Sequence, residues 1–216
     1  MRTFGGSIIA RMISSYLVTA VAAYFVGSIP TGYLLARARG VDIRGLGSGN
    51  IGATNVFRVL GKTAGVIVLL IDALKGFVPA KFLLIGATPE NLEYHAMVAG
   101  LFAIIGHNYT CWLRFKGGKG IATSAGVVIA LAPMALMIAL GAWILVFALS
   151  RYVSLASVLA AAVLPWAVRL SGQSRTMLAL AVILSALAIY KHKANIQRLL
   201  AGTESRLRFG KGEAVK

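Results

Sequence analysis

Long apolar segments alternate with short polar ones along most of the chain. A helix needs about 20 residues to cross the roughly 30 Å of hydrocarbon in a bilayer. Three of the apolar segments are that long and two others nearly are, whereas the stretch 121–149 is divided by Pro133. The segments cover residues 12–36, 64–87, 92–113, 121–132, 134–149, 153–170 and 176–190. This pattern predicts an all-α integral membrane protein.

The stretch 121–149 is either one overlong helix kinked at Pro133 or two short helices that turn at Ala132–Pro133. The positions of Lys and Arg separate these alternatives. With seven spans, 16 of the 22 Lys and Arg lie on one side of the membrane and four on the other, whereas six spans place ten on each side. Because cytoplasmic loops carry the Lys/Arg excess, we predict seven transmembrane helices, two of them short, with the N-terminus outside and the C-terminus cytoplasmic.

Composition narrows the class of protein further. The chain is 58% hydrophobic, has a mean hydropathy of +0.81 and is only 13% charged, which excludes an ordinary soluble domain. Its net charge of +16 does not indicate a nucleic-acid partner, because the cations flank bilayer-length segments. The single Cys111 excludes an intramolecular disulfide. We predict one domain over residues 1–216, with a core over about 12–206 and a basic tail over 207–216.

The N-terminus has a second interpretation as a cleaved signal peptide. Arg2 and Arg11 would form its basic region, and Ala20–Val21–Ala22 would be an A-x-A cleavage site. The apolar run continues well past that point, so we favour an uncleaved first span.

Three polar segments interrupt the apolar sequence, and each combines cations with glycines or amides: residues 44–58, 114–123 and 191–204. Backbone amides exposed by glycine can converge on an anion together with Arg and Lys donors. The seven-span topology places all three segments on the cytoplasmic face. We therefore expect one phosphate-handling site there.

The first segment is rich in small polar residues. Gly47, Gly49 and Gly52 permit close backbone approach, and Arg58 follows as a planar phosphate donor. The candidate anion ligands among them are Ser48, Gly49, Asn50, Thr54 and Asn55. A flexible loop, with Arg58 as a topology charge, is the alternative.

The second segment, FKGGKGIAT, resembles a phosphate cradle. Gly117, Gly118 and Gly120 would leave the main chain exposed, Lys116 and Lys119 would supply charge, and the dipole of the following helix would point at the anion. The Walker A spacing is absent, and a tight basic turn is the alternative. His107, just upstream, is interpreted as an interhelical packing residue.

The third segment places His192 and Asn195 on one face of a predicted helix. A histidine can act as a general base and an amide can orient a hydroxyl. The alternative is an amphipathic helix that lies on anionic lipid, which would have the same sequence pattern. Glu204 could orient a cation or end the helix. Two smaller features accompany this segment: Ser154 and Ser157 are possible donors, and Asp72 with Lys75 is predicted to form a structural ion pair.

Several kinds of chemistry are absent from the sequence. No nucleophile elbow, catalytic triad or metal-ligand spacing occurs, so we expect neither a metal nor a cofactor. The chain has many groups that can bind anions and few acidic residues. Such a site suits substrates that already carry a phosphate and an activated bond for the reaction.

The polar segments also resemble a known family. GSGNIGATN at 47–55, GHN followed by FKGGKGIAT at 106–123, and IYKHKANIQRLLAGTE at 189–204 closely resemble the signature blocks of the bacterial acyl-phosphate:glycerol-3-phosphate acyltransferases, the PlsY family. DALKG at 72–76 and RYVSLAS at 151–157 extend the similarity over residues 27–204.

The resemblance implies an acyltransferase of phospholipid biosynthesis in the bacterial inner membrane. It would transfer a fatty acyl group from acyl phosphate to the 1-hydroxyl of sn-glycerol 3-phosphate, giving lysophosphatidic acid and phosphate. Ser48, Asn50 and the glycines of both loops would hold acyl phosphate, with its tail between spans. The residues around glycerol 3-phosphate would be Arg58, Lys119, Ser157, His192 and Asn195.

Two mechanisms stay open at this point. His192 could deprotonate the attacking hydroxyl, or the leaving phosphate could take the proton while His192 only positions the acceptor. Two rival functions also remain, an anion transporter with a broken helix at Pro133 and a non-catalytic lipid-binding scaffold. The polar groups gather on one side and no inverted half is visible, which disfavours the transporter.

Overall fold

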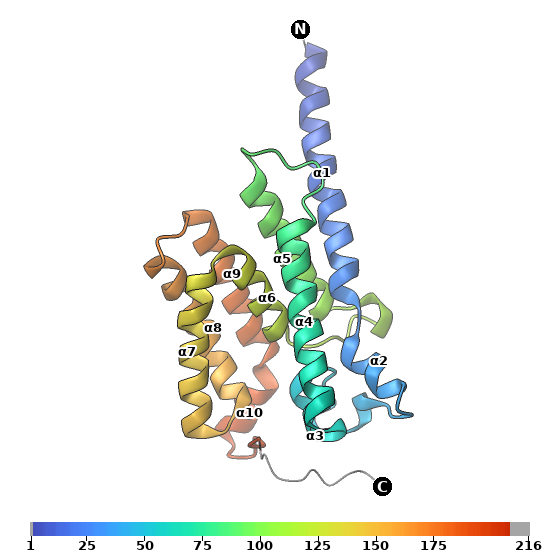
Figure 1. The fold of residues 1–216 in the computed structure, drawn as a ribbon, viewed down its shortest axis with the longest axis vertical. Coiled ribbons are helices and arrows are strands. Elements are labelled where there is room, and N and C mark those ends of the chain that lie inside the picture. The colour runs from blue at the N-terminus through green and yellow to red at the C-terminus, as the bar shows by residue number, and fades with distance from the viewer. Residues whose placement is uncertain (1, 208–216) are drawn as a thin grey trace.

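The computed structural model describes residues 2–207, and within them every regular element is helical (Figure 1). Most of the predicted basic tail therefore lies outside the described residues. Two short 3-10 turns, η1 (Ile43–Gly45) and η2 (Cys111–Leu113), lie in the connections. The α-helices are α1 (Arg2–Ser28), α2 (Thr31–Arg37), α3 (Ala53–Leu60), α4 (Lys62–Phe82), α5 (Leu92–Asn108), α6 (Ile121–Leu131), α7 (Pro133–Ser150), α8 (Val153–Leu170), α9 (Arg175–Lys191) and α10 (Lys193–Leu200).

Each predicted apolar segment is helical over most of its length. Five helical segments in the described part are long and apolar enough to cross a membrane, and α9 with α10 adds a sixth if that bent pair is one span. The apolar α6 has only 11 residues. The all-helical membrane architecture is thus confirmed, whereas seven crossings and their orientation stay predictions.

The ambiguous stretch 121–149 forms two helices. Ala132 leaves the helical region, with φ −145° and ψ 68°, and Pro133 opens α7 as its first residue. Proline suits that position because the first helical amide needs no intrahelical acceptor. Pro30 breaks the first apolar segment in a similar way and separates α1 from α2.

Glycines let several helices pack at close range. A Cβ on Gly27 of α1 would lie 2.0 Å from the carbonyl oxygen of Ala103 on α5, and one on Gly76 of α4 would lie 2.0 Å from that of Thr123 on α6. Such contacts suit membrane bundles, where close packing replaces the hydrophobic effect as the force between helices. They join α1 to α5 and α4 to α6 into a scaffold beneath the polar loops.

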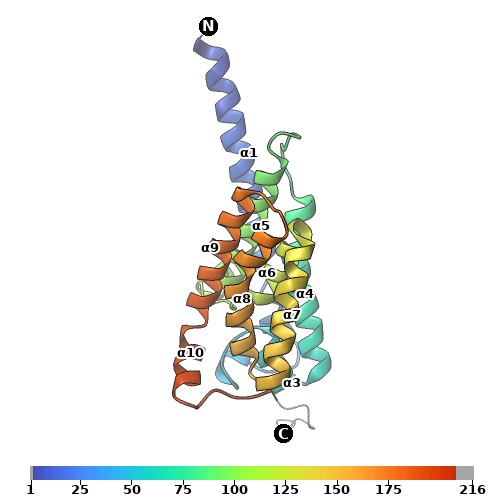
Figure 2. The same cartoon turned by 90° about the vertical axis from the view of Figure 1, so that its left-hand side faces the viewer.

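The polar segments lie toward one end of this bundle. Figures 1 and 2 show α3 and α10 at that end, opposite the start of α1. In Figure 1 the connection between α5 and α6 lies part-way along the bundle rather than at its tip. The second polar segment therefore lies farther from this end of the bundle than the first and third do.

Candidate active site

The three polar segments meet in one pocket of about 240 Å³. Each predicted segment supplies part of its wall, so their expected convergence is observed. The lining residues are Ser48, Gly49 and Asn50, then Gly117 and Lys119, then Lys191, Ala194, Asn195 and Arg198. Three of these side chains are cationic, which makes the pocket suited to an anion.

Asn55 organises the first loop from inside. Its Oδ1 accepts the amide of Ser48 at 2.8 Å, and its Nδ2 donates to the carbonyls of Leu46 at 3.0 Å and Asn50 at 2.9 Å. The side chain is only 2% exposed and does not line the pocket. The geometry therefore supports a role for Asn55 in shaping the loop rather than in touching a ligand. Thr54, half-buried, is also absent from the lining.

The second loop differs from the expected cradle of bare amides. The amide of Gly117 donates to the carbonyl of Asn108 at 3.2 Å, and that of Gly118 donates to the carbonyl of His107 at 3.0 Å. A Cβ on Gly117 would lie 2.0 Å from the oxygen of His107, so this glycine is required for packing on the end of α5. The expectation that these two amides are bare was wrong, because α5 ends beneath them and its last carbonyls need donors.

The two lysines of this loop have different surroundings. Lys119 lies in the pocket and donates through Nζ to Oδ1 of Asn195. Lys116 is exposed and outside the lining. Gly120, with φ +80°, adopts the left-handed conformation that starts α6, so it acts through the backbone turn.

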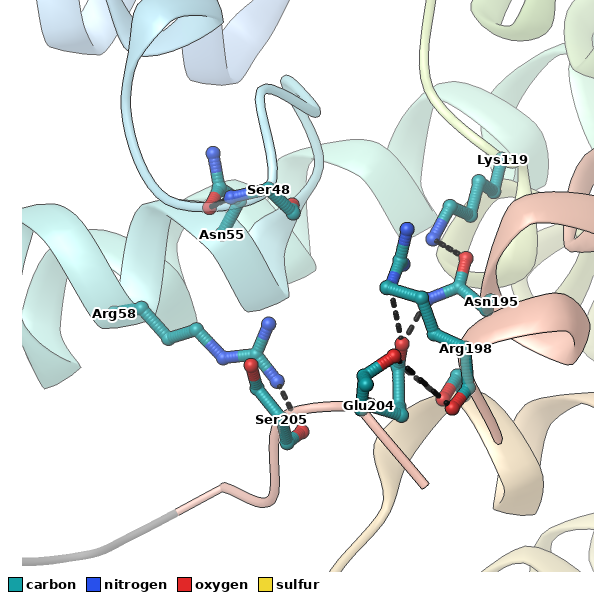
Figure 3. A network of polar contacts seen from close by, with 10 residues as sticks. Ser48, Asn55, Arg58, Lys119, Asn195, Arg198, Glu204 and Ser205 are labelled. Carbon is teal, nitrogen blue, oxygen red and sulfur yellow. Dashed lines mark hydrogen bonds and ion pairs between the residues drawn. The ribbon is translucent and has the colours of Figure 1, made fainter. Parts of the chain in front are cut away.

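Glu204 connects the third segment to its neighbours. Its Oε1 accepts Nδ2 of Asn195 and the hydroxyl of Ser154, both at 2.7 Å. Its Oε2 accepts Nε of Arg198 at 2.7 Å (Figure 3). The carboxylate thereby fixes an amide and a guanidinium at the pocket while offsetting part of the positive charge.

Three other predicted residues lie outside the pocket lining. Arg58 donates to the carbonyl of Ser205 at 2.9 Å (Figure 3). Ser157 donates to the carbonyl of Val153 at 2.8 Å and accepts Nε1 of Trp143 at 3.2 Å, so its hydroxyl is already occupied. His192 is 3% exposed and is described below.

Burial and the surrounding cations make Lys119 easy to deprotonate. Burial is the main cause that lowers its pKa to about 8; nearby Arg198, Arg58 and Lys191 lower it further, and Glu204 opposes them. Burial alone would raise the pKa of Glu204, but its hydrogen bonds with Ser154, Asn195 and Arg198 lower it overall. A bound anion would stabilise the cationic form of Lys119.

His192, between α9 and α10, is neutral near pH 7. Burial is the main cause that lowers its pKa to about 4, and the positive charge of Lys119 lowers it further. Nδ1 lies 2.7 Å from the carbonyl of Ala188, so Nδ1–H is the donor in the neutral ring. This tautomer leaves the Nε2 lone pair as a weakly basic acceptor.

Sequence reasoning missed Lys191, Ala194 and Arg198 as lining residues. A signal for Arg198 was present, since it follows Asn195 by three residues and shares its helix face. Lys191 belongs to α9, and the bend at His192 brings it alongside α10 at the pocket.

Comparison with known proteins identifies clear relatives. Residues 17–202 match the family model described as glycerol-3-phosphate acyltransferase. The glycerol-3-phosphate acyltransferase of Geotalea daltonii is 47% identical over 193 residues, which cover 89% of this chain and 98% of that protein. That of Desulforudis audaxviator is 50% identical over 190 residues, covering 88% and 94%.

Solved structures show the same similarity. The crystal structure of PlsY, an integral membrane glycerol 3-phosphate acyltransferase, in its glycerol 3-phosphate form superimposes with a TM-score of 0.84. Its sequence is 41% identical, and the match covers 90% of this chain and 96% of that one. The lysophosphatidic acid form of PlsY matches with a TM-score of 0.81, at 40% identity and the same coverage.

Proposed function

Because this chain belongs to the glycerol-3-phosphate acyltransferase family, we propose that it transfers a fatty acyl group from acyl phosphate to the 1-hydroxyl of sn-glycerol 3-phosphate. The products are lysophosphatidic acid and inorganic phosphate. Membership of the family makes the chain an acyltransferase of phospholipid biosynthesis. The choice of donor and the roles of individual residues are the parts that we propose.

The observation that carries the proposal is the cationic pocket. Lys119, Lys191 and Arg198 line it, while Glu204 is the carboxylate in the surrounding network. Both proposed substrates carry a phosphate, and each charge-assisted hydrogen bond contributes about 1.5–3 kcal/mol. Solved relatives bound to glycerol 3-phosphate and to lysophosphatidic acid support the acceptor and the product.

We assign the two phosphates to different walls. Ser48, Gly49 and Asn50 face the donor phosphate, with the second loop beside them. Lys119 and Asn195 hold the acceptor, and Arg58 of α3 adds positive charge near Lys119 from outside the lining. Ser157 is given no contact with substrate, because its hydroxyl is bonded to Trp143 and to the carbonyl of Val153.

The proposed reaction is one displacement at the acyl carbon. The acceptor hydroxyl oxygen bonds to this carbon, the bond from carbon to phosphate oxygen breaks, and the hydroxyl proton moves to the departing phosphate. In the complex before reaction, Nε2 of His192 accepts a hydrogen bond from this hydroxyl and orients its oxygen; as the bond to the acyl carbon forms, the hydroxyl proton turns from Nε2 to the departing phosphate oxygen. A ring whose pKa is lowered to about 4 is a poor base at neutral pH, which favours phosphate as the proton acceptor.

Substitution of His192 distinguishes a base from a positioning group. We expect His192→Gln to keep kcat within about tenfold at saturating acceptor, because the amide preserves a polar group at the position of Nε2. His192→Ala should raise the acceptor KM more strongly. Steady-state kinetics with varied glycerol 3-phosphate would measure both effects, and a loss of several orders of magnitude in the Gln variant would show that a protein base is required.

The donor is tested with purified protein in detergent. We expect lysophosphatidic acid to form from acyl phosphate and glycerol 3-phosphate. We expect none when acyl-CoA or acylated acyl carrier protein replaces acyl phosphate. Product formation without a sealed compartment also excludes transport as the explanation. Turnover only with a thioester donor would contradict the proposed donor while leaving the family assignment intact.

We further propose seven crossings, with the pocket on the cytoplasmic face of the bacterial inner membrane. The Lys/Arg distribution supports this topology. The position of α3 and α10 at one end of the bundle is compatible with it (Figure 1).

A further inference from the structure

A buried charged cluster lies in the helix bundle beneath the second polar loop. Asp72 and Lys75 on α4 form an ion pair of 2.8 Å, which confirms the predicted pairing. Nδ1 of His107 on α5 lies 3.8 Å from Oδ1 of Asp72. All three side chains are at most 5% exposed. Lys75 also donates to the carbonyl of Ile29 at 2.9 Å, which ties the cluster to the break between α1 and α2.

On its other side, the His107 ring supports the loop that carries Lys119. A Cβ added to Gly118 would lie 2.1 Å from Nε2 of His107, so the ring fills the space directly beside this glycine. The carbonyl of His107 also accepts the amide of Gly118 at 3.0 Å. One residue therefore contacts the loop through both its backbone and its ring, immediately before Lys119 enters the pocket.

Stability alone does not account for this cluster. Nδ1 of His107, both polar side-chain atoms of Asn108 and the hydroxyl of Thr123 are buried without a hydrogen-bond partner in the described part of the chain. Buried charges and unpaired polar atoms cost free energy, and a well-packed apolar core is often at least as stable. Ionisable groups inside a membrane protein therefore point to a function.

We propose that His107 is a positioning residue for the acyl transfer. Its ring packs against Gly118 so that Lys119 is aimed at Asn195 and the phosphate, and the Asp72–Lys75 pair lies on the other side of the ring, with Oδ1 of Asp72 3.8 Å from Nδ1. This role rests on the proposed function, since it assigns Lys119 to substrate binding. His107 itself touches no substrate.

His95 provides a matched control on the same helix. It is 0% exposed, stacks on Tyr16 with ring centroids 3.9 Å apart, and pairs with Ser15 at 3.2 Å. It lies near the start of α5, whereas His107 lies near the end. Both substitutions remove a buried imidazole, but only one of them removes the support of the loop.

The test compares His107→Ala with His95→Ala in purified full-length protein. We expect His107→Ala to lower kcat/KM about 100-fold, the size of effect that a displacement of about 1 Å produces at a reacting centre. The acceptor KM should rise because Lys119 is misdirected. His95→Ala should lose a similar amount of thermal stability and keep its kinetic constants. His107→Asn, which keeps an amide toward Asp72 but removes the ring beside Gly118, should reproduce the kinetic loss if the Ala variant does not fold.

A double-mutant cycle with Gly118→Ala tests the contact itself. Because both changes act through one contact, His107→Ala combined with Gly118→Ala should be far less harmful than the product of the single effects. In the control double variant, the fold-losses of kcat/KM from His95→Ala and Gly118→Ala should multiply. Three results would overturn the proposal. The first is wild-type kinetics in both His107→Ala and His107→Asn, and the second is an equal loss of kcat/KM in His95→Ala. The third is that the losses of kcat/KM from His107→Ala and Gly118→Ala multiply in the double variant. If the proposed donor is wrong, the wild-type protein itself will be inactive with acyl phosphate. The double-mutant cycle is then measured with the donor that supports turnover.

Discussion

Lys119→Met is expected to lower kcat/KM by about 10²–10³, which is the usual cost of removing one preorganised electrostatic donor from an active site. Lys119 is the cation that donates to Asn195 inside the pocket, and Met preserves much of the length of its side chain. Detergent assays with varied acceptor concentration would measure the loss. Lys193→Met is the matched control, since it removes the same charge from an exposed position on α10 outside the lining. Equal losses of kcat/KM in Lys119→Met and Lys193→Met would show that the effect comes from net charge and not from the position of Lys119 in the pocket.

The same lysine predicts a pH dependence. Burial lowers the pKa of Lys119 to about 8, so the free enzyme loses this cation as the pH rises through that value. Binding of an anionic acceptor favours the protonated form, and the acceptor KM should therefore rise above about pH 8. This rise should vanish in Lys119→Met. A wild-type KM that stays flat between pH 7 and pH 9 would contradict the assignment of Lys119 to the phosphate.

Gly117→Ala is expected to reduce turnover by at least about 100-fold, because misplacement by about 1 Å at a reacting centre has this effect. The new Cβ would lie 2.0 Å from the oxygen of His107 and 2.8 Å from the carbonyl carbon of Asn108, and backbone atoms cannot rotate away as a side chain can. Overpacking of this kind also costs about 1–3 kcal/mol of stability.

Gly141→Ala is the control for the Gly117 variant. Gly141 lies in α7, and a Cβ there would meet nothing within 4 Å. Activity and the thermal unfolding midpoint should both be close to those of the wild type. Near-normal turnover in Gly117→Ala would mean that the second loop tolerates displacement and does not set the geometry of the pocket.

The helical elements were predicted from hydrophobic patterning, and the Lys/Arg distribution favoured two helices over one kinked helix in the stretch 121–149. Apolar length predicted where the membrane helices lie, and Pro133 is the first residue of a helix, a position that its ring suits, whereas Pro79 and Pro165 lie inside α4 and α8. The glycine-rich and cationic composition of the three polar segments predicted that they meet, and residues from all three line one pocket.

Details that depend on tertiary contacts were beyond the sequence. The third apolar segment forms a candidate span over Leu92–Leu113 as predicted, but the α-helix within it ends at Asn108, and its last carbonyls accept the amides of Gly117 and Gly118. No local pattern shows which carbonyls a glycine-rich loop will meet. Similarly, two serines one turn apart are equivalent by composition, yet Ser154 joins Glu204 whereas Ser157 faces Trp143.

The carboxyl-terminal segment has a practical consequence for protein engineering. Glu204 anchors Asn195 and Arg198, Ser205 accepts Arg58, and the amide of Leu207 donates to the carbonyl of Arg151 at 2.9 Å. Residues 204–207 are thus held against the folded helices and support two residues of the proposed site, Asn195 and Arg198. A truncation boundary chosen for crystallisation belongs after Leu207, and a purification tag or fluorescent fusion needs a flexible spacer beyond it.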